Sequence, residues 1–387
     1  MDNVINIKRL LRLFEVMSGL RLNLKKTVLL GVNVEEQVLK RWVDAINCKV
    51  GALPTEYPGL PLGYSKNCLA IWNPIIDKVR AKLEGWKGKL LSFAGRIILV
   101  KSVLSNLPVH YLSLFQIPCK VVDTLNKSIA RFVWGFNSTH PIHWVSWDNL
   151  CKPMKFGSLG LVDLRIKNRS LLNKWLWRFS IEPNALWRKF IESKYDIDQN
   201  NMFSVHTIKR KNSWVWKHIS KPLENPSDLF LSKIRFKIGD GSCINFWDDW
   251  STQVPSLRAE FSRLHAIARK KSVKVVDFGS KVDGVWVWKI ELRRRLFEWE
   301  LQLWDVFMSM LDLVALGSGL SDGLKWIGDS GGVYTPSSFC RVVSSIGLKE
   351  DPIWMLVWQN LAPPKVEAFI WKVIQGRVPS LSELMKR

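Results

Sequence analysis

The apolar residues of this chain recur mostly at helical spacing. The most regular stretch steps by three or four residues through Val79, Leu83, Trp86, Leu90, Phe93, Ile97, Val100 and Leu104. A seam of this kind predicts one amphipathic helix or two consecutive helices. Ser92 is a typical N-cap residue, and together with Gly85 and Gly88 it predicts a break near residue 91. Similar spacing predicts helices near residues 4–17, 121–136, 171–179, 288–316 and 354–371.

Shorter apolar runs predict a few strands. Residues 27–34 and 44–50 form two such runs near the start of the chain. Further on, Gly239-Asp240-Gly241 follows the run at 234–238 and precedes another, a pattern that predicts a β-hairpin. The sequence therefore predicts a mainly α fold with small β elements, of the α+β class. A chain of 387 residues is longer than a single hydrophobic core usually supports, so we expect several domains.

Basic residues lie beside the apolar seam. At 100° per residue, Lys78, Lys82, Lys89 and Arg96 project within about 40° of one another, and Lys101 follows on the same stretch. A cationic stripe next to a buried face is suited to following a phosphate backbone. The alternative interpretation is an ordinary amphipathic helix with a solvated basic face.

The charge of the whole chain points the same way. Lys and Arg number 57 against 34 Asp and Glu, a net charge of +23, which predicts a polyanionic partner such as nucleic acid. The 21 tryptophans either stack on unpaired bases or anchor packed helices.

Six well-separated cysteines exclude a small disulfide scaffold and favour a reducing, intracellular setting. The longest charge-free run, 102–119, is interrupted by prolines, so we expect no membrane partner.

Few residues invite a catalytic or metal-binding interpretation. Two-metal chemistry needs several clustered carboxylates, and the pair Asp248-Asp249 has no obvious third, so it predicts a turn or helix cap. His140, His143 and Cys151 offer three zinc ligands where a structural site needs four. The residues alone indicate a basic, helix-rich, nucleic-acid-binding chain without a visible active site.

Several segments occur in a recognisable order. They are residues 14–34, 57–63 (Tyr-Pro-Gly-Leu-Pro-Leu-Gly), 86–96, 173–178 (Asn-Lys-Trp-Leu-Trp-Arg), 246–250 (Phe-Trp-Asp-Asp-Trp) and 358–371. In this order they resemble the C-terminal part of plant LINE-type (non-LTR) retrotransposon reverse transcriptases, with Pro58 a departure from the family's loop. The resemblance implies a palm remnant at 1–50, a thumb-like helical region at 51–150, a Trp-rich basic linker region at 151–325 and the N-terminal half of a zinc-binding domain at 326–387.

The resemblance also carries expectations about function. The family's thumb grips the template–primer duplex, which makes Lys78, Lys82, Lys89, Arg96 and Lys101 the expected phosphate contacts. The catalytic Tyr-x-Asp-Asp motif is expected before residue 14 and is not found there, and the zinc ligands are expected beyond the last residue. The implied magnesium and zinc sites therefore lie outside this chain, which leaves it with no cofactor, no ribonuclease H carboxylates and no polymerase activity of its own. Family behaviour implies a nuclear location.

Three other interpretations stay open. The chain is a degenerate or co-opted protein-interaction module that uses its Trp-rich helices, a mis-bounded piece of an active RNA-directed DNA polymerase, or a product that never folds stably. The last is favoured by the first 50 residues, where a palm remnant would leave strand edges unpaired.

Overall fold

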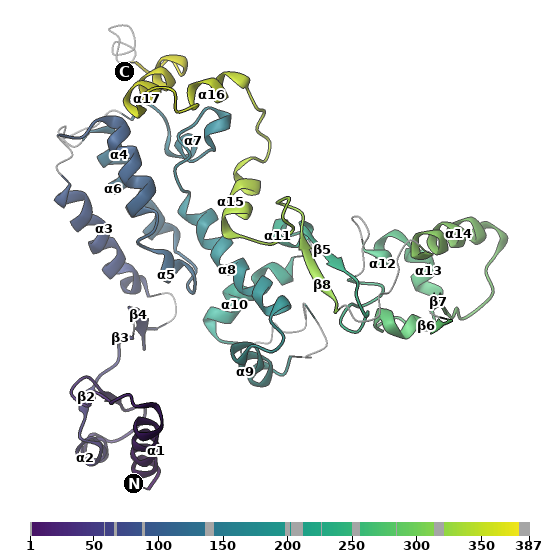
Figure 1. The fold of residues 1–387 in the computed structure, drawn as a ribbon, viewed down its shortest axis with the longest axis horizontal. Helices are drawn as coiled ribbons and strands as arrows, with labels where there is room; N and C mark the ends of the chain where they lie inside the picture. Colours follow the sequence, from purple (N-terminus) through teal and green to yellow (C-terminus); the bar gives the residue numbers. More distant parts are fainter. Residues whose placement is uncertain are drawn as a thin grey trace. The chain divides into compact units, whose positions relative to one another are not determined.

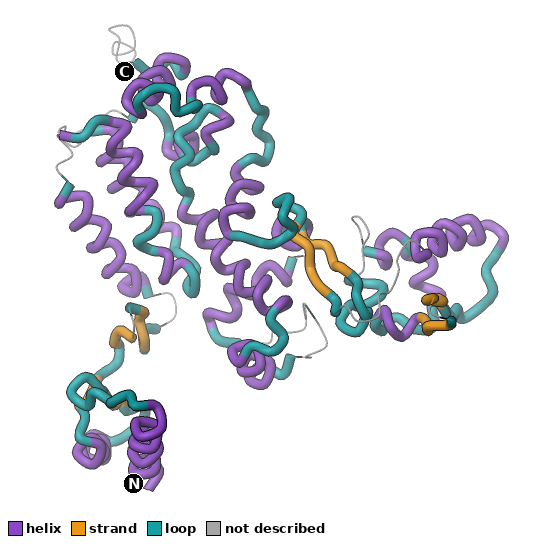
Figure 2. Tube along the Cα trace, viewed as in Figure 1, coloured by secondary structure: helices purple, strands orange, loops and turns teal. Residues whose placement is uncertain are grey.

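The computed structural model describes residues 2–57, 59–65, 68–86, 90–135, 143–197, 202, 212–225, 227–249, 256–283, 285–312 and 321–378. The chain divides into two compact units, Met1–Pro74 and Ile75–Arg387. Helices dominate both the described residues and the buried positions, and the strands form small two-stranded sheets (Figures 1 and 2). The predicted mainly α fold with small β elements is confirmed.

The described residues of the first unit form two helices and two pairs of strands. Its elements are α1 (Asp2–Ser18), β1 (Val28–Leu30), α2 (Glu36–Ile46), β2 (Lys49–Gly51), β3 (Thr55–Tyr57), β4 (Leu60–Leu62) and the 3₁₀ turn η1 (Leu69–Trp72). β1 and β2 pair in parallel, and β3 and β4 pair antiparallel. The strand expected at 44–50 is wrong for residues 44–48, because Leu39, Val43 and Ile46 bury one face of α2 at helical spacing and Asn47 caps the end of that helix.

The predicted seam becomes two helices in the second unit. They are α3 (Asn73–Gly85) and α4 (Phe93–Leu99), and the latter continues into the π-helical turn η3 (Val100–Leu104). The predicted break is confirmed, because the Ser92 side chain accepts a hydrogen bond from the Gly95 N–H at 3.2 Å. Leu90 departs from the seam and is 80% exposed. The chain then passes through α5 (Val109–Leu112) into α6 (Cys119–Trp134).

A large aromatic core packs around α8 (Leu164–Ile181). The other helices of this core are α9 (Leu186–Tyr195), α10 (Trp214–Ser220), α11 (Leu229–Ser232) and α15 (Pro336–Ser344). The short elements α7 (Trp147–Leu150) and η4 (Met154–Phe156) precede α8, and η6 (Lys221–Glu224) lies between α10 and α11. Trp177 on α8 and Trp216 on α10 are buried there, so these tryptophans anchor packed helices, and Trp326 is buried in the same core at the end of a strand. The Tyr334 hydroxyl donates a hydrogen bond to the Ser170 carbonyl at 2.7 Å and ties the start of α15 to α8.

The hairpin predicted around Gly239-Asp240-Gly241 is wrong. The strand before it, β5 (Ile234–Lys237), pairs antiparallel with the distant β8 (Gly323–Trp326). The physical reason lies beside β8, where the Asp322 carboxylate accepts hydrogen bonds from the N–H groups of Gly239, Gly241 and Cys243. These bonds hold the glycine turn next to β8 and direct the following run into a second core.

The second core is built mainly from residues 243–311 of this unit, and Met202, Phe236, Ile238 and Leu324 also pack in it. It involves α12 (Leu257–Glu260), α13 (Ser262–Ile267), η7 (Val275–Phe278), the hairpin β6 (Gly279–Val282) and β7 (Val285–Trp288), and α14 (Glu298–Asp312). The helix predicted at 288–316 begins ten residues late, because Trp288 ends a strand, and the predicted residues 313–316 lie outside the described part of the chain. At the far end of the chain, α16 (Pro352–Val357) and α17 (Pro364–Ile374) are two separate helices, the second of which begins at Pro364. α17 packs against α4 (Figure 1).

Candidate nucleic-acid interface

Lys78 and Lys82 share one exposed face of α3. The adjacent face of the helix buries Ile75, Val79 and Leu83, while both lysine side chains are exposed to solvent. They line a shallow hollow of about 490 Å³, together with Ala81, Gly85, Trp86 and Leu107. Within the part of the chain that the structure describes, neither lysine has an ion-pair partner, and the neighbouring Arg80 carries the contact to Asp77 at 3.8 Å. The two charges are therefore available to an anion from solvent.

The other predicted contacts have different surroundings. Lys89 lies outside the described residues. Arg96 is half-buried on α4, and its guanidinium donates hydrogen bonds to the carbonyls of Leu91, Phe132 and Val133 at 3.2–3.4 Å. Because Phe132 and Val133 belong to the last turn of α6, Arg96 supplies donors to helix carbonyls that lack intrahelical partners.

Lys101 is also partly withdrawn from solvent. It lies on η3, and its Nζ is 3.5 Å from the Met154 sulfur. Burial lowers the pKa of Lys101 and also that of Arg96. The break between α3 and α4 thus divides the predicted stripe: Lys78 and Lys82 stay together on one open face, while Arg96 and Lys101 lie on another helix. Phosphate contact by any of the five residues stays a prediction.

Lys372 is a further basic residue that the sequence patterns did not identify. The Lys372 Nζ on α17 lies 3.7 Å from the centroid of the Phe93 ring on α4. Phe93 in turn lies 5.2 Å from the Trp134 ring, centroid to centroid. No periodicity connects positions so far apart along the chain, so only the packing of α17 on α4 could reveal this site.

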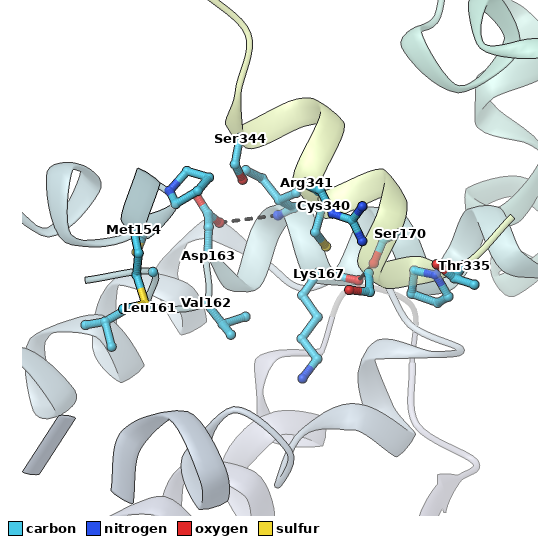
Figure 3. A pocket seen from close by; sticks show the side chains of 16 residues that line it. Met154, Leu161, Val162, Asp163, Lys167, Ser170, Thr335, Cys340, Arg341 and Ser344 are labelled. Atoms are coloured by element: carbon cyan, nitrogen blue, oxygen red, sulfur yellow. Dashed lines mark hydrogen bonds between the residues drawn. The ribbon is translucent and has the colours of Figure 1, made fainter. Parts of the chain in front are cut away.

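A pocket of about 720 Å³ lies between the start of α8 and α15 (Figure 3). Asp163 lines it and caps α8 by accepting hydrogen bonds from the N–H groups of Arg165 and Ile166. Lys167 extends away from Asp163 and donates to the Ser105 carbonyl at 2.5 Å.

Two thiols also line this pocket. Burial raises the pKa of Cys151 to about 12 and also raises that of Cys340. Both thiols are therefore protonated at neutral pH, and neither is an activated nucleophile. The pocket offers shape and a few polar groups without the arrangement that nucleophilic catalysis requires.

The carboxylate pair Asp248-Asp249 belongs to a turn, as predicted. The Asp249 carboxylate accepts hydrogen bonds from the Asn245 N–H and side-chain amide at 3.0 and 2.7 Å, and Asp248 pairs with Arg258 at 3.2 Å. Burial raises the pKa of Asp249 to about 6. Of the three suggested zinc ligands, His140 lies outside the described residues. Among the described residues, no group of three or more His, Cys, Asp or Glu side chains is placed to hold a metal ion.

Comparison with known proteins gives distant relatives. No family model matches the chain. It is 28% identical over 330 residues to the Arabidopsis thaliana protein "Putative ribonuclease H protein At1g65750", a match that covers 81% of this chain and 49% of that protein. It is 29% identical over 157 residues to the Arabidopsis thaliana "Uncharacterized mitochondrial protein AtMg00310", which covers 39% of this chain and 98% of the relative. The chain thus spans about half the length of the first relative.

Among the described helices, none has the length and apolar character needed to cross a bilayer.

Proposed function

We propose that this chain is a piece of a plant LINE-type retrotransposon reverse transcriptase and that its own activity is to bind RNA, DNA or their hybrid. Three observations support this function: the net charge of +23, the order of segments that resembles the family, and the distant similarity to plant proteins. The binding face assigned to the duplex is the exposed side of α3.

The pair Lys78 and Lys82 carries the proposal. Residues four apart on a helix are neighbours on one face, with Cβ atoms about 5–6 Å apart. Both ammonium groups therefore meet the same stretch of a phosphate backbone, and Trp86 borders the same hollow. Because no acidic partner among the described residues competes for these lysines, a phosphate displaces only water and counterions.

We infer that the chain alone does not polymerise DNA. The resemblance assigns polymerisation to a metal-binding Tyr-x-Asp-Asp motif, which does not occur in the sequence. The adjacent Asp248 and Asp249 are engaged in turn and ion-pair contacts, which suits the linker role that the resemblance gives them. The ribonuclease H in the relative's name concerns that protein, and we propose no nuclease activity for this chain.

The test measures binding and synthesis by the same purified protein. A fluorescent RNA–DNA hybrid duplex is titrated at several salt concentrations between about 50 and 200 mM, and a primed template is offered with magnesium and nucleotides. The proposed function predicts affinity that falls steeply as salt rises and no primer extension. Binding that is absent, or that does not change with salt, would refute it, and primer extension would refute the inactivity.

A further inference from the structure

A groove of about 860 Å³ runs between α4 and α17. Half-buried Phe93 and Lys372 line its floor, and exposed Leu90, Lys365 and Phe369 line its rim. Phe369 is 57% exposed, so much of its ring surface is accessible to a ligand. Two lysines and no carboxylate line the groove, so its charge is positive.

The positive charges on this face repel one another. Arg96 lies close enough to Lys372 to lower the pKa of that lysine, in addition to the larger effect of burial. The hydrogen-bond partners of Arg96 are backbone carbonyls, and the described residues give Lys372 no acidic partner. Two half-buried like charges without a counterion are unfavourable, and an anion bound between them would relieve the repulsion.

Aromatic rings lie beside these charges. Phe93 is stacked on Trp371 with centroids 6.3 Å apart, and Lys372 covers the Phe93 ring. Phe369 stands at the rim with its ring open to solvent. Cations that meet the backbone and aromatic faces that stack on bases are together the features by which proteins hold unpaired strands.

We propose that the groove between α4 and α17 binds single-stranded RNA or DNA. A phosphate is held by Lys365 and Lys372, and a base stacks on Phe369. The inference rests on the proposed function for its ligand class, and it adds a second site on a different helix from Lys78 and Lys82. A groove that was purely apolar would favour a protein segment, whereas this one places uncompensated positive charge at its floor and rim.

The experiment compares two ligands and two variants. Lys365→Gln combined with Phe369→Ala changes only exposed side chains of the groove, so the fold is expected to survive, and circular dichroism checks this. Lys120→Gln with Lys127→Gln is the control, because these exposed lysines of α6 lie outside the groove. Affinity is measured by fluorescence anisotropy for a labelled single strand and for a hybrid duplex.

The groove variant is expected to bind the single strand about tenfold more weakly, with less change in duplex affinity, since one stacked base and one phosphate contact are lost. The control is expected to lose less. A 4-thiouridine strand crosslinked by light is expected to label peptides that contain Phe93 or Phe369. Unchanged single-strand affinity, or crosslinks confined to other peptides, would overturn the groove site while duplex binding keeps the proposed function. If the unaltered protein binds neither ligand, both are refuted.

Discussion

The Asp322 carboxylate accepts a hydrogen bond from the backbone N–H of Gly241 at 2.9 Å, across 81 residues of sequence. Gly241 has a φ of +73°, a left-handed conformation that glycine adopts without strain. The same carboxylate also bonds the N–H groups of Gly239 and Cys243 at 2.8 Å. One side chain thus satisfies three backbone donors at the junction between the two aromatic cores.

Asp322→Ala is expected to lower the free energy of unfolding by about 2–3 kcal/mol, because partly buried donors lose a charged acceptor. Asp322→Asn is the matched control, since its remaining oxygen can still accept from both glycines. It is expected to lose about half as much. Denaturant titration measures both variants, and an alanine variant as stable as the parent protein would contradict this account of the turn.

The contacts of Glu300 predict how the stability of the fold changes at low pH. This carboxylate is buried, bonds Arg294 through two contacts of 2.7 Å and accepts from Arg263 and from the Phe297 N–H. The hydrogen bonds from Arg294 are the largest cause that holds its pKa at about 2, below the ordinary 4.5. The stabilisation is therefore present above pH 4.5 and is lost as pH falls toward 2. Glu300→Gln is expected to unfold more easily at pH 6 and to lose less stability between pH 5 and pH 3 than the parent. Equal pH dependence in both proteins would show that Glu300 does not act this way.

The pKa of Asp249 is shifted in the opposite direction, so its contribution to stability changes with pH in the opposite sense. Burial raises its pKa from 3.8 to about 6, so the folded state holds a proton that the unfolded state has released between those values. Stability linked to this group falls as pH rises from about 4 to 6. Asp249→Asn keeps an acceptor for Asn245 and removes the charge, so the variant is expected to be at least as stable as the parent at pH 7. Marked destabilisation at pH 7 in thermal unfolding would contradict the assignment.

Tyr334 tests the junction between α8 and α15. Tyr334→Phe keeps the buried ring and removes the hydroxyl that bonds the Ser170 carbonyl. The expected cost is about 1 kcal/mol in the free energy of unfolding. Tyr195→Phe is a useful comparison, because its hydroxyl accepts from the Ser213 N–H at 3.2 Å, a longer bond in the same core. A cost for Tyr334→Phe near zero would mean that water replaces the lost bond.

Local patterns explain which features could be predicted. The helical seam at 79–104 and its break at Ser92 depend on neighbours three or four residues away, and both were found. The partner of β5 was not, because Gly239-Asp240-Gly241 has the composition of a hairpin and only the distant Asp322 redirects it. The meeting of Phe93 with Lys372 has no local signal at all.

The candidate interface shows the same limit. Helical projection placed Lys78 and Lys82 on one face correctly, because both lie within α3. It could not follow the stripe past the break, where Arg96 turns to the carbonyls that end α6. An arginine beside a seam looks alike in sequence whether it meets a phosphate or a helix end.

The salt dependence of binding by the Lys78→Gln/Lys82→Gln protein tests the central claim most directly. Each phosphate contact contributes about −0.9 to the slope of log affinity against log salt for a duplex. The account predicts that this variant reduces the slope for the hybrid duplex by about two units, whereas Lys120→Gln/Lys127→Gln, which removes the same charge from α6, leaves it nearly unchanged. Equal slopes in the two variants would contradict a duplex-binding face on α3.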